Sequence, residues 1–269
     1  MKLAVLPMTR VVTGLLLLGA MRGLFAQDVP ADLEARLVPL AVRDVPGAFG
    51  SRWSATLVGL NGRDGVLVYG LNYVNPVLPL PAGLPWSASP IPTRDFEAPG
   101  SIIYVPKEAS DDVNMAIVIR QDGASLPDEI SMPVVRQSEF VSRPIYFLGL
   151  QDNVDERTHL RVYSLDLHLS RIAVRFQILA PNAQFTWRVV HDATIDLDVK
   201  QRTSLWPYDR PLPVRPWATQ IALDPLFDAS RSSGPYIIVL TPLTDGAKLW
   251  AFVSETDNTT QHIQLMFSQ

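Results

Sequence analysis

Apolar and polar side chains alternate with a period of two in several stretches of this chain. Successive side chains of a β-strand point to opposite faces, so this pattern is typical of a strand that buries one face against a core. The stretches are residues 113–119, 172–178, 185–189, 194–199 and 263–267. They predict half-buried antiparallel strands. Residues 37–42 predict a first strand, and the continuous apolar run of residues 236–240 predicts a central strand covered on both faces.

The 23 prolines of the chain exclude long helices from much of it, because proline lacks the backbone donor and disrupts a helix interior. Seven of them lie between residues 75 and 100, and another proline and aromatic cluster spans residues 206–217. Such runs favour extended backbone and cannot form a central strand, so we expect residues 75–100 to be a long surface loop. Short strands, frequent turns and no convincing long helix together predict an all-β fold made of β-sandwiches.

A two-strand pattern in residues 51–72 recurs later in the chain. Its turn, NGRDG, is rich in Asn, Gly and Asp, which predicts a β-hairpin. VGLN at residues 58–61 corresponds to LGLQ at 148–151, and VYGL at residues 68–71 corresponds to VYSL at 162–165. The order and spacing of these landmarks favour two tandem antiparallel domains over the alternative of one large sandwich.

The first 26 residues resemble a secretory signal peptide. A basic start with Lys2 and Arg10 precedes an apolar run over residues 11–21, and Ala26 offers a cleavage site. We therefore expect a signal peptide at residues 1–26, a first β-sandwich at 27–130 and a second at 131–269. Removal of residues 1–26 would take away three basic side chains and no acid, so the formal net charge of −4 would become about −7.

Composition narrows the function classes further. The chain has no cysteine, which rules out disulfides, thiolate nucleophiles and thiolate zinc sites. A mildly acidic mature protein lacks the basic surface that nucleic-acid binding requires. With no later apolar stretch long enough to span a membrane, we expect export to the periplasm, the cell surface or the medium. The unknown partner would be a protein or a glycan.

Two aromatic and proline segments are the candidate binding surfaces. Rigid backbone lowers the cost of ordering a binding loop, so their rings would present stacking platforms for sugars or for a partner protein. The competing interpretation is that these large rings cap the open ends of the sandwiches. The candidate binding residues are Trp86, Phe96, Trp206, Tyr208 and Trp217.

Acidic clusters are the other candidate functional sites. Asp196 and Asp198 share one face of a strand, close to His191 and Asp192. This arrangement suits a pair of catalytic or calcium-binding carboxylates, and it is equally typical of the solvent face of a strand. Asp152, Asp155 and Glu156 crowd one turn with oxygen ligands, which predicts a structural calcium site as the one possible cofactor. We find no nucleophile elbow, phosphate loop or dinucleotide fingerprint, and the four histidines lack zinc-site spacing.

A proline-containing first strand, PGAFGSRW at residues 46–53 and FVSETDNTT at residues 252–260 resemble exported bacterial proteins of uncharacterised function. That resemblance implies tandem immunoglobulin-like β-sandwiches and export, and it supplies no catalytic residue. The family pattern has Thr or Ser two residues after the Trp, where Ala55 stands here.

From these observations we expect an exported, non-enzymatic structural, adhesive or binding module. The alternatives are a secreted glycan-acting hydrolase that uses a carboxylate pair, with Asp196 or Asp198 as one member, and a calcium-stabilised carbohydrate-binding protein.

Overall fold

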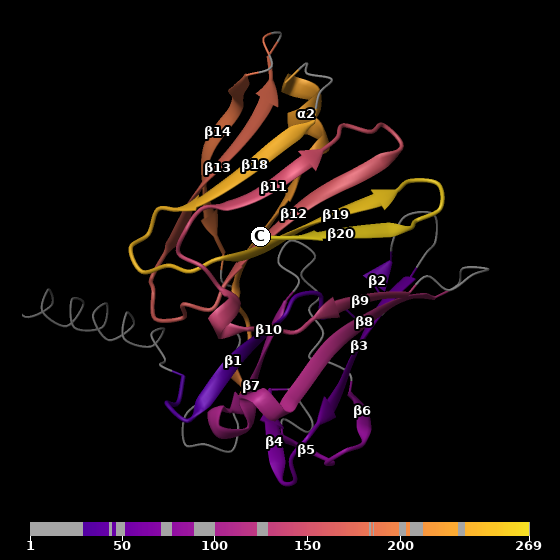
Figure 1. Cartoon of the computed structure of the whole chain (residues 1–269), viewed down its shortest axis with the longest axis vertical. Helices are drawn as coiled ribbons and strands as arrows, with labels where there is room; N and C mark the ends of the chain where they lie inside the picture. Colours follow the sequence, from indigo (N-terminus) through magenta and orange to yellow (C-terminus); the bar gives the residue numbers. More distant parts are fainter. Residues whose placement is uncertain are drawn as a thin grey trace, which may run out of the picture.

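The computed structural model is an all-β protein of antiparallel sheets (Figure 1). It describes residues 29–42, 45–46, 52–70, 77–88, 100–122, 129–182, 184, 186–198, 203–204, 212–230 and 235–268. The expected signal peptide and the candidates Phe96, Trp206 and Tyr208 lie outside these residues. Among the described residues, no helix has the length and apolar character needed to cross a membrane.

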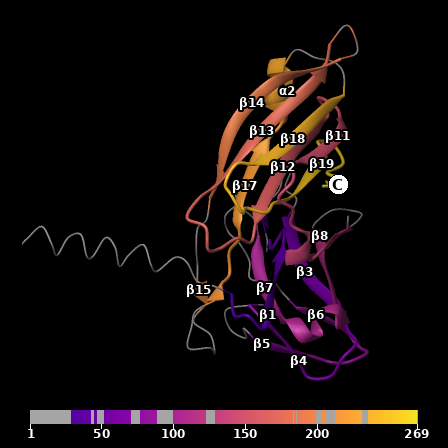
Figure 2. The ribbon, with the colours of Figure 1, turned by 60° about the vertical axis from the view of Figure 1, so that its left-hand side comes forward.

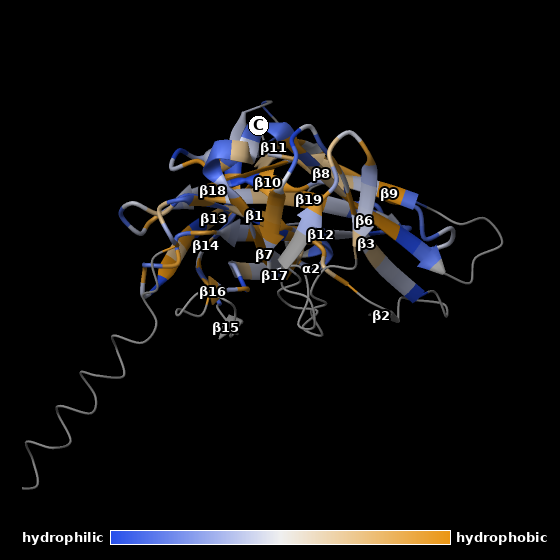
Figure 3. Cartoon of the chain, turned by 90° about the horizontal axis from the view of Figure 1, so that it is seen from below, coloured by the Kyte–Doolittle hydropathy of each residue, from blue (hydrophilic) through white to orange (hydrophobic). Residues whose placement is uncertain are grey.

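The first half of the chain contains two facing sheets. One has the strand order β10-β1-β7-β4-β5; the other has the order β2-β3-β8-β9, with β6 also paired to β3. The elements are β1 (Leu33–Val38), β2 (Val45–Pro46), β3 (Arg52–Asn61), β4 (Val66–Tyr69), β5 (Val77–Leu80), β6 (Pro85–Ala88), β7 (Ser101–Pro106), the 3-10 helix η2 (Lys107–Asp112), β8 (Val113–Asp122), β9 (Glu129–Pro133) and β10 (Val135–Arg136). Hydrophobic residues concentrate around β1 and β7, near the middle of Figure 3.

The second half forms two four-stranded sheets, β11-β18-β13-β14 and β17-β12-β19-β20, and a small pair, β15-β16 (Figure 2). The elements are the 3-10 helix η3 (Gln137–Glu139), β11 (Ile145–Leu150), β12 (Glu156–Ser164), β13 (Ile172–Pro181), β14 (Trp187–Leu197), β15 (Thr203–Ser204), β16 (Leu212–Pro213), β17 (Trp217–Ala222), α2 (Asp224–Ser230), β18 (Tyr236–Pro242), β19 (Trp250–Asp257) and β20 (Ile263–Phe267). Alternate residues of β13 are buried, as the period of two predicts.

The two halves share one four-strand arrangement. In the first, the chain crosses from β3 to β4 in the opposite sheet, β7 pairs with β4, and β8 pairs with β3 after the short helix η2. In the second, it crosses from β11 to β12, β17 pairs with β12, and β18 pairs with β11 after α2. The landmarks that recur in the sequence therefore fall on strands with equivalent pairing.

The predicted hairpin over residues 51–72 is wrong, although both of its strands exist. β3 pairs with β2, β6 and β8, whereas β4 pairs with β5 and β7 in the other sheet. The turn residue Asn61 is fully buried, its Nδ2 atom donates to the carbonyl of Leu80 over 3.3 Å, and the Gly62 amide donates to the carbonyl of Asp112 over 2.9 Å. These contacts hold the turn as an arch between sheets, which local turn chemistry cannot distinguish from a hairpin.

Three further strand predictions need correction. The first strand covers Leu33–Val38 rather than residues 37–42, and it ends where Pro39 supplies no backbone donor. The proline segment, expected to be a loop, contributes β5 and β6, but only at sheet edges, where proline is tolerated. β18 is central in its sheet as predicted, yet Ile237 and Val239 are only half buried, because one face of that sheet is uncovered.

The outward face of that sheet carries apolar side chains. Trp187 and Val189 on β14 are 46% and 49% exposed, and Leu148 on β11 is 59% exposed. The alternation in residues 185–189 therefore places its described apolar side chains toward solvent rather than toward a core.

Hydrogen bonds connect the halves where residues 212–216 lie beside β7. The Ile102 amide donates to the Val214 carbonyl over 3.0 Å, and the Arg215 guanidinium donates to the Gly100 carbonyl over 3.0 Å. β10 also pairs with β1, although it follows the predicted boundary at residue 130. The buried apolar residues of both halves form one connected cluster.

Candidate binding site

A shallow hollow of about 580 Å³ lies where β6, β3 and β8 run side by side. Its lining is mostly apolar and small, and it includes one of the aromatic residues singled out in the sequence. The lining residues are Val58, Gly59, Pro85, Trp86, Ser87, Asn114, Met115 and Ala116. Small residues and few charges around a large ring suit the apolar face of a ligand.

Trp86 forms one boundary of the hollow through its contact with Gly59. The two residues are cross-strand partners, and Met115 faces Gly59 from the other side. A Cβ atom on Gly59 would lie 2.5 Å from Cζ2 of Trp86 and 2.7 Å from the Asn114 carbonyl oxygen. Only glycine therefore allows the indole to lie across β3 in this position.

The Trp86 side chain has an unpaired donor. The residue is 9% exposed, and its buried Nε1 atom has no hydrogen-bond partner. A buried indole N–H usually finds an acceptor, because an unpaired donor loses its hydration without compensation. Trp86 thus packs in the core and also bounds the hollow. It has features of both interpretations that the sequence offers, a ring that caps the sandwich and a ring that contacts a ligand.

The other described aromatic candidate, Trp217, lies in a different part of the fold. It begins β17, is 8% exposed and pairs across strands with Ser164. Its Nε1 atom is also buried without a partner. Trp86 and Trp217 belong to different sheets in different halves, so they do not form one platform.

Of the two carboxylates suggested for a hydrolase, Asp196 is bound by an arginine, as is the nearby Asp192. Both carboxylate oxygens of Asp196 accept from Arg171, at 2.7 and 2.9 Å, and those of Asp192 accept from Arg175, at 3.0 and 2.6 Å. These hydrogen bonds lower the pKa of Asp196 and Asp192 below their ordinary values. A general acid needs the opposite shift, so neither carboxylate is suited to that role. Asp198 bridges to Ala218 through its backbone and is exposed.

The turn with Asp152, Asp155 and Glu156 is organised by Asn153, whose side-chain oxygen accepts from the Asp155 amide over 3.1 Å. Burial and the nearby charge of Asp228 raise the pKa of Asp152. In the described part of the chain, no three His, Cys, Asp or Glu side chains are grouped so that they could hold a metal ion. The calcium site remains a prediction.

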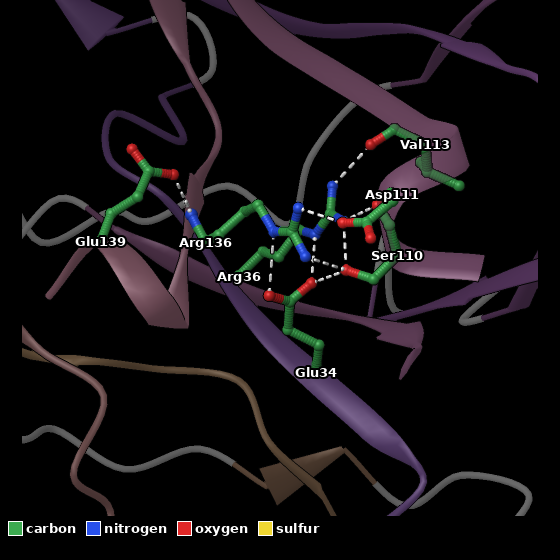
Figure 4. Close-up of polar contacts among 7 residues, drawn as sticks. All are labelled: Glu34, Arg36, Ser110, Asp111, Val113, Arg136 and Glu139. Carbon is green, nitrogen blue, oxygen red and sulfur yellow. Dashed lines mark hydrogen bonds and ion pairs between the residues drawn. The ribbon is translucent and has the colours of Figure 1, made fainter. Parts of the chain in front are cut away.

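A buried polar cluster joins β1, η2 and β10 (Figure 4). Arg36 donates to the Val113 carbonyl over 2.7 Å and to Glu34 over 3.1 Å, and Arg136 donates to the other oxygen of Glu34 over 3.1 Å. Burial alone would raise the pKa of Glu34, but hydrogen bonds from Ser110 and Arg136 and both arginine charges outweigh it and lower that pKa. Because both charged groups on β1 have partners, we assign this cluster to the fold rather than to chemistry.

Two features of the hollow were missed by the sequence analysis. The sequence indicates Gly59 only as part of a repeated landmark and Met115 only as a strand residue, and neither pattern shows that an indole lies between the strands. The signal that could have identified Gly59 is a glycine inside a strand, which marks close approach of another group.

Comparisons with protein-family models, with characterised proteins and with solved structures find no match to this chain. The resemblance to exported bacterial β-sandwich proteins therefore stays a prediction.

Proposed function

We propose that this chain is an exported, non-enzymatic binding protein of two tandem immunoglobulin-like β-sandwiches, and that it takes the apolar face of a sugar ring into the hollow beside Trp86. The observation that carries this proposal is an apolar hollow of about 580 Å³ bounded by the indole of Trp86. In the complex, the C–H face of the sugar packs on the apolar lining beside the indole.

The recurring four-strand arrangement supports the tandem organisation. Equivalent crossings from β3 to β4 and from β11 to β12 place corresponding landmarks in equivalent positions. The arginine partners of Asp192 and Asp196 weigh against the hydrolase alternative, because they favour the charged form of both carboxylates.

A glycan array followed by titration calorimetry tests the proposal. Trp86→Phe keeps an aromatic ring but removes part of the surface that bounds the hollow, so we expect binding of the array ligand to weaken at least tenfold. Trp217→Phe is the matched control, since Trp217 is equally buried with an equally unpaired Nε1 but does not line the hollow. An array without a hit, or equal affinities for both variants, would overturn the proposal. Thermal melting with calcium and with a chelator tests the calcium-stabilised alternative.

A further inference from the structure

Three basic residues lie in line on one face of the sheet β17-β12-β19-β20. They are Arg157, His159 and Arg161, which alternate along β12 and so point to the same side, away from the buried Leu160 and Val162. We call them the basic row. The side chain of each is partly exposed. The row is separate from the Trp86 hollow, which lies in the first half of the chain.

Only neutral groups contact the two arginines among the described residues. The Arg157 guanidinium donates to Oε1 of Gln261 over 2.9 Å, and the Arg161 guanidinium donates to Oγ of Ser254 over 2.8 Å. The Nε atoms of both arginines are buried and have no acceptor. No described carboxylate lies within ion-pair distance of either guanidinium.

Six other arginines among the described residues have an acidic partner. Each of the following donates to, or forms an ion pair with, an Asp or Glu: Arg36, Arg63, Arg120, Arg136, Arg171 and Arg175. Exposed arginines need no such partner, but a desolvated guanidinium loses hydration that only hydrogen bonds and a counter-charge replace. The basic row lacks that counter-charge.

The surroundings of the row leave its positive charge uncompensated. Arg161 stacks over the ring of Phe252 at 5.4 Å, and burial lowers the pKa of its guanidinium. Burial, Arg161 and Arg157 lower the pKa of His159 to about 4. From the flanking strands, the residues that face His159 are Ala222 of β17 and Ser254 of β19, neither of which titrates.

We propose that the basic row binds an oxyanion, carried by a ligand as a carboxylate or phosphate group. The planar guanidinium fork matches both groups, and each guanidinium makes only one hydrogen bond to a described side chain, from a terminal nitrogen. Ser254 already draws the Arg161 head toward the His159 position, because Ser254 and His159 are cross-strand partners. The anion therefore binds over His159, between the two arginines.

Titration calorimetry of the full chain with inorganic phosphate and with succinate, at constant ionic strength, tests this proposal. We expect at least one probe to saturate at one site, and the tighter probe identifies the group. Arg161→Gln and Arg157→Gln should each weaken that binding about tenfold or more. Arg175→Gln is the control, because Arg175 is exposed and paired with Asp192 on another sheet.

Three additional measurements keep the result interpretable. Arg161→Lys retains the charge and removes the fork, so it should also weaken binding, and circular dichroism establishes whether each variant is folded. The imidazole resonances of His159, followed by NMR against pH, should show a higher pKa with the bound probe than without it. Saturation by neither probe, undiminished affinity in the row variants, or an unchanged His159 titration would overturn the proposal.

Discussion

The hydroxyl of Tyr163 donates a 2.7 Å hydrogen bond to the carbonyl oxygen of Pro39, which connects β12 of the second half to the residue that follows β1 of the first. Tyr163 is fully buried. A second tyrosine, Tyr104 on β7, donates in the opposite direction to the carbonyl of Pro213. The halves are therefore held together by reciprocal hydrogen bonds as well as by shared apolar packing.

Tyr163→Phe should destabilise the protein by about 1–3 kcal/mol, because it leaves the buried carbonyl of Pro39 without this donor. Urea unfolding measures the change. Tyr146→Phe is the control, since Tyr146 is 45% exposed on β11, and its loss of a hydroxyl should leave the unfolding midpoint nearly unchanged. Equal midpoints for wild type and Tyr163→Phe would contradict the role assigned to this bond.

Gly100→Ala should weaken the same contact between the halves by overpacking. A Cβ atom there would lie 3.0 Å from Cγ of Pro216 and 3.0 Å from Cε1 of Tyr163, so one of them must move. We expect a loss of about 1–3 kcal/mol in the free energy of unfolding, measured in urea. Gly62→Ala offers a matched control, because its nearest neighbour would be 3.6 Å away. A stabilised Gly100→Ala variant would show that this contact accommodates a Cβ atom without steric strain.

Much of the strand content could be predicted from alternation, because burial of one face acts on each strand locally. Residues 113–119 and 172–178 became half-buried strands for that reason. Which strands pair is a different question. Asn61 and Gly62 are residues typical of hairpin turns, yet their hydrogen-bond partners, Leu80 and Asp112, are distant in the sequence. Local chemistry identifies the turn but not the sheet that the chain enters next.

Only part of the candidate site could be predicted from the sequence. Trp86 could be singled out as a large ring in a proline-rich segment, but the hollow depends on Gly59 and Met115 from two other strands. The pairing of Asp196 with Arg171 was equally hidden, because cross-strand register decides it. Residue type indicates which side chains could act; register determines which of them meet.

Glu34→Gln should lower stability at neutral pH and also change how stability depends on pH. The variant leaves Arg36 and Arg136 without their shared counter-charge, which we expect to cost about 1–3 kcal/mol. In the wild type, the folded pKa of Glu34 lies below the unfolded value, so the unfolded chain takes up this proton first as the pH falls. Glu34 therefore stabilises the fold fully above its ordinary, unfolded pKa of 4.5 and loses that contribution as pH falls through the lowered folded pKa.

Urea unfolding at a series of pH values from neutral to acid measures both effects. The difference in stability between wild type and Glu34→Gln should shrink as the pH falls below about 4.5, the unfolded pKa. Glu129→Gln is the control, because Glu129 pairs with Arg120 on an exposed edge and should change stability little at any pH. A constant difference between wild type and Glu34→Gln across the series would exclude a lowered pKa for Glu34.

Asn61→Ala should open the arch between β3 and β4. The fully buried side chain donates to the carbonyl of Leu80 and accepts from the Arg63 amide over 3.2 Å, so the substitution removes both hydrogen bonds. We expect a cost of about 1–3 kcal/mol, read from urea unfolding, and faster amide exchange at Arg63. Gln264→Ala, on the exposed side of β20, is the comparison for a simple loss of an amide side chain. If residues 61–65 formed a solvated hairpin turn instead, Asn61→Ala and Gln264→Ala would behave alike, and exchange at Arg63 would already be fast in the wild type.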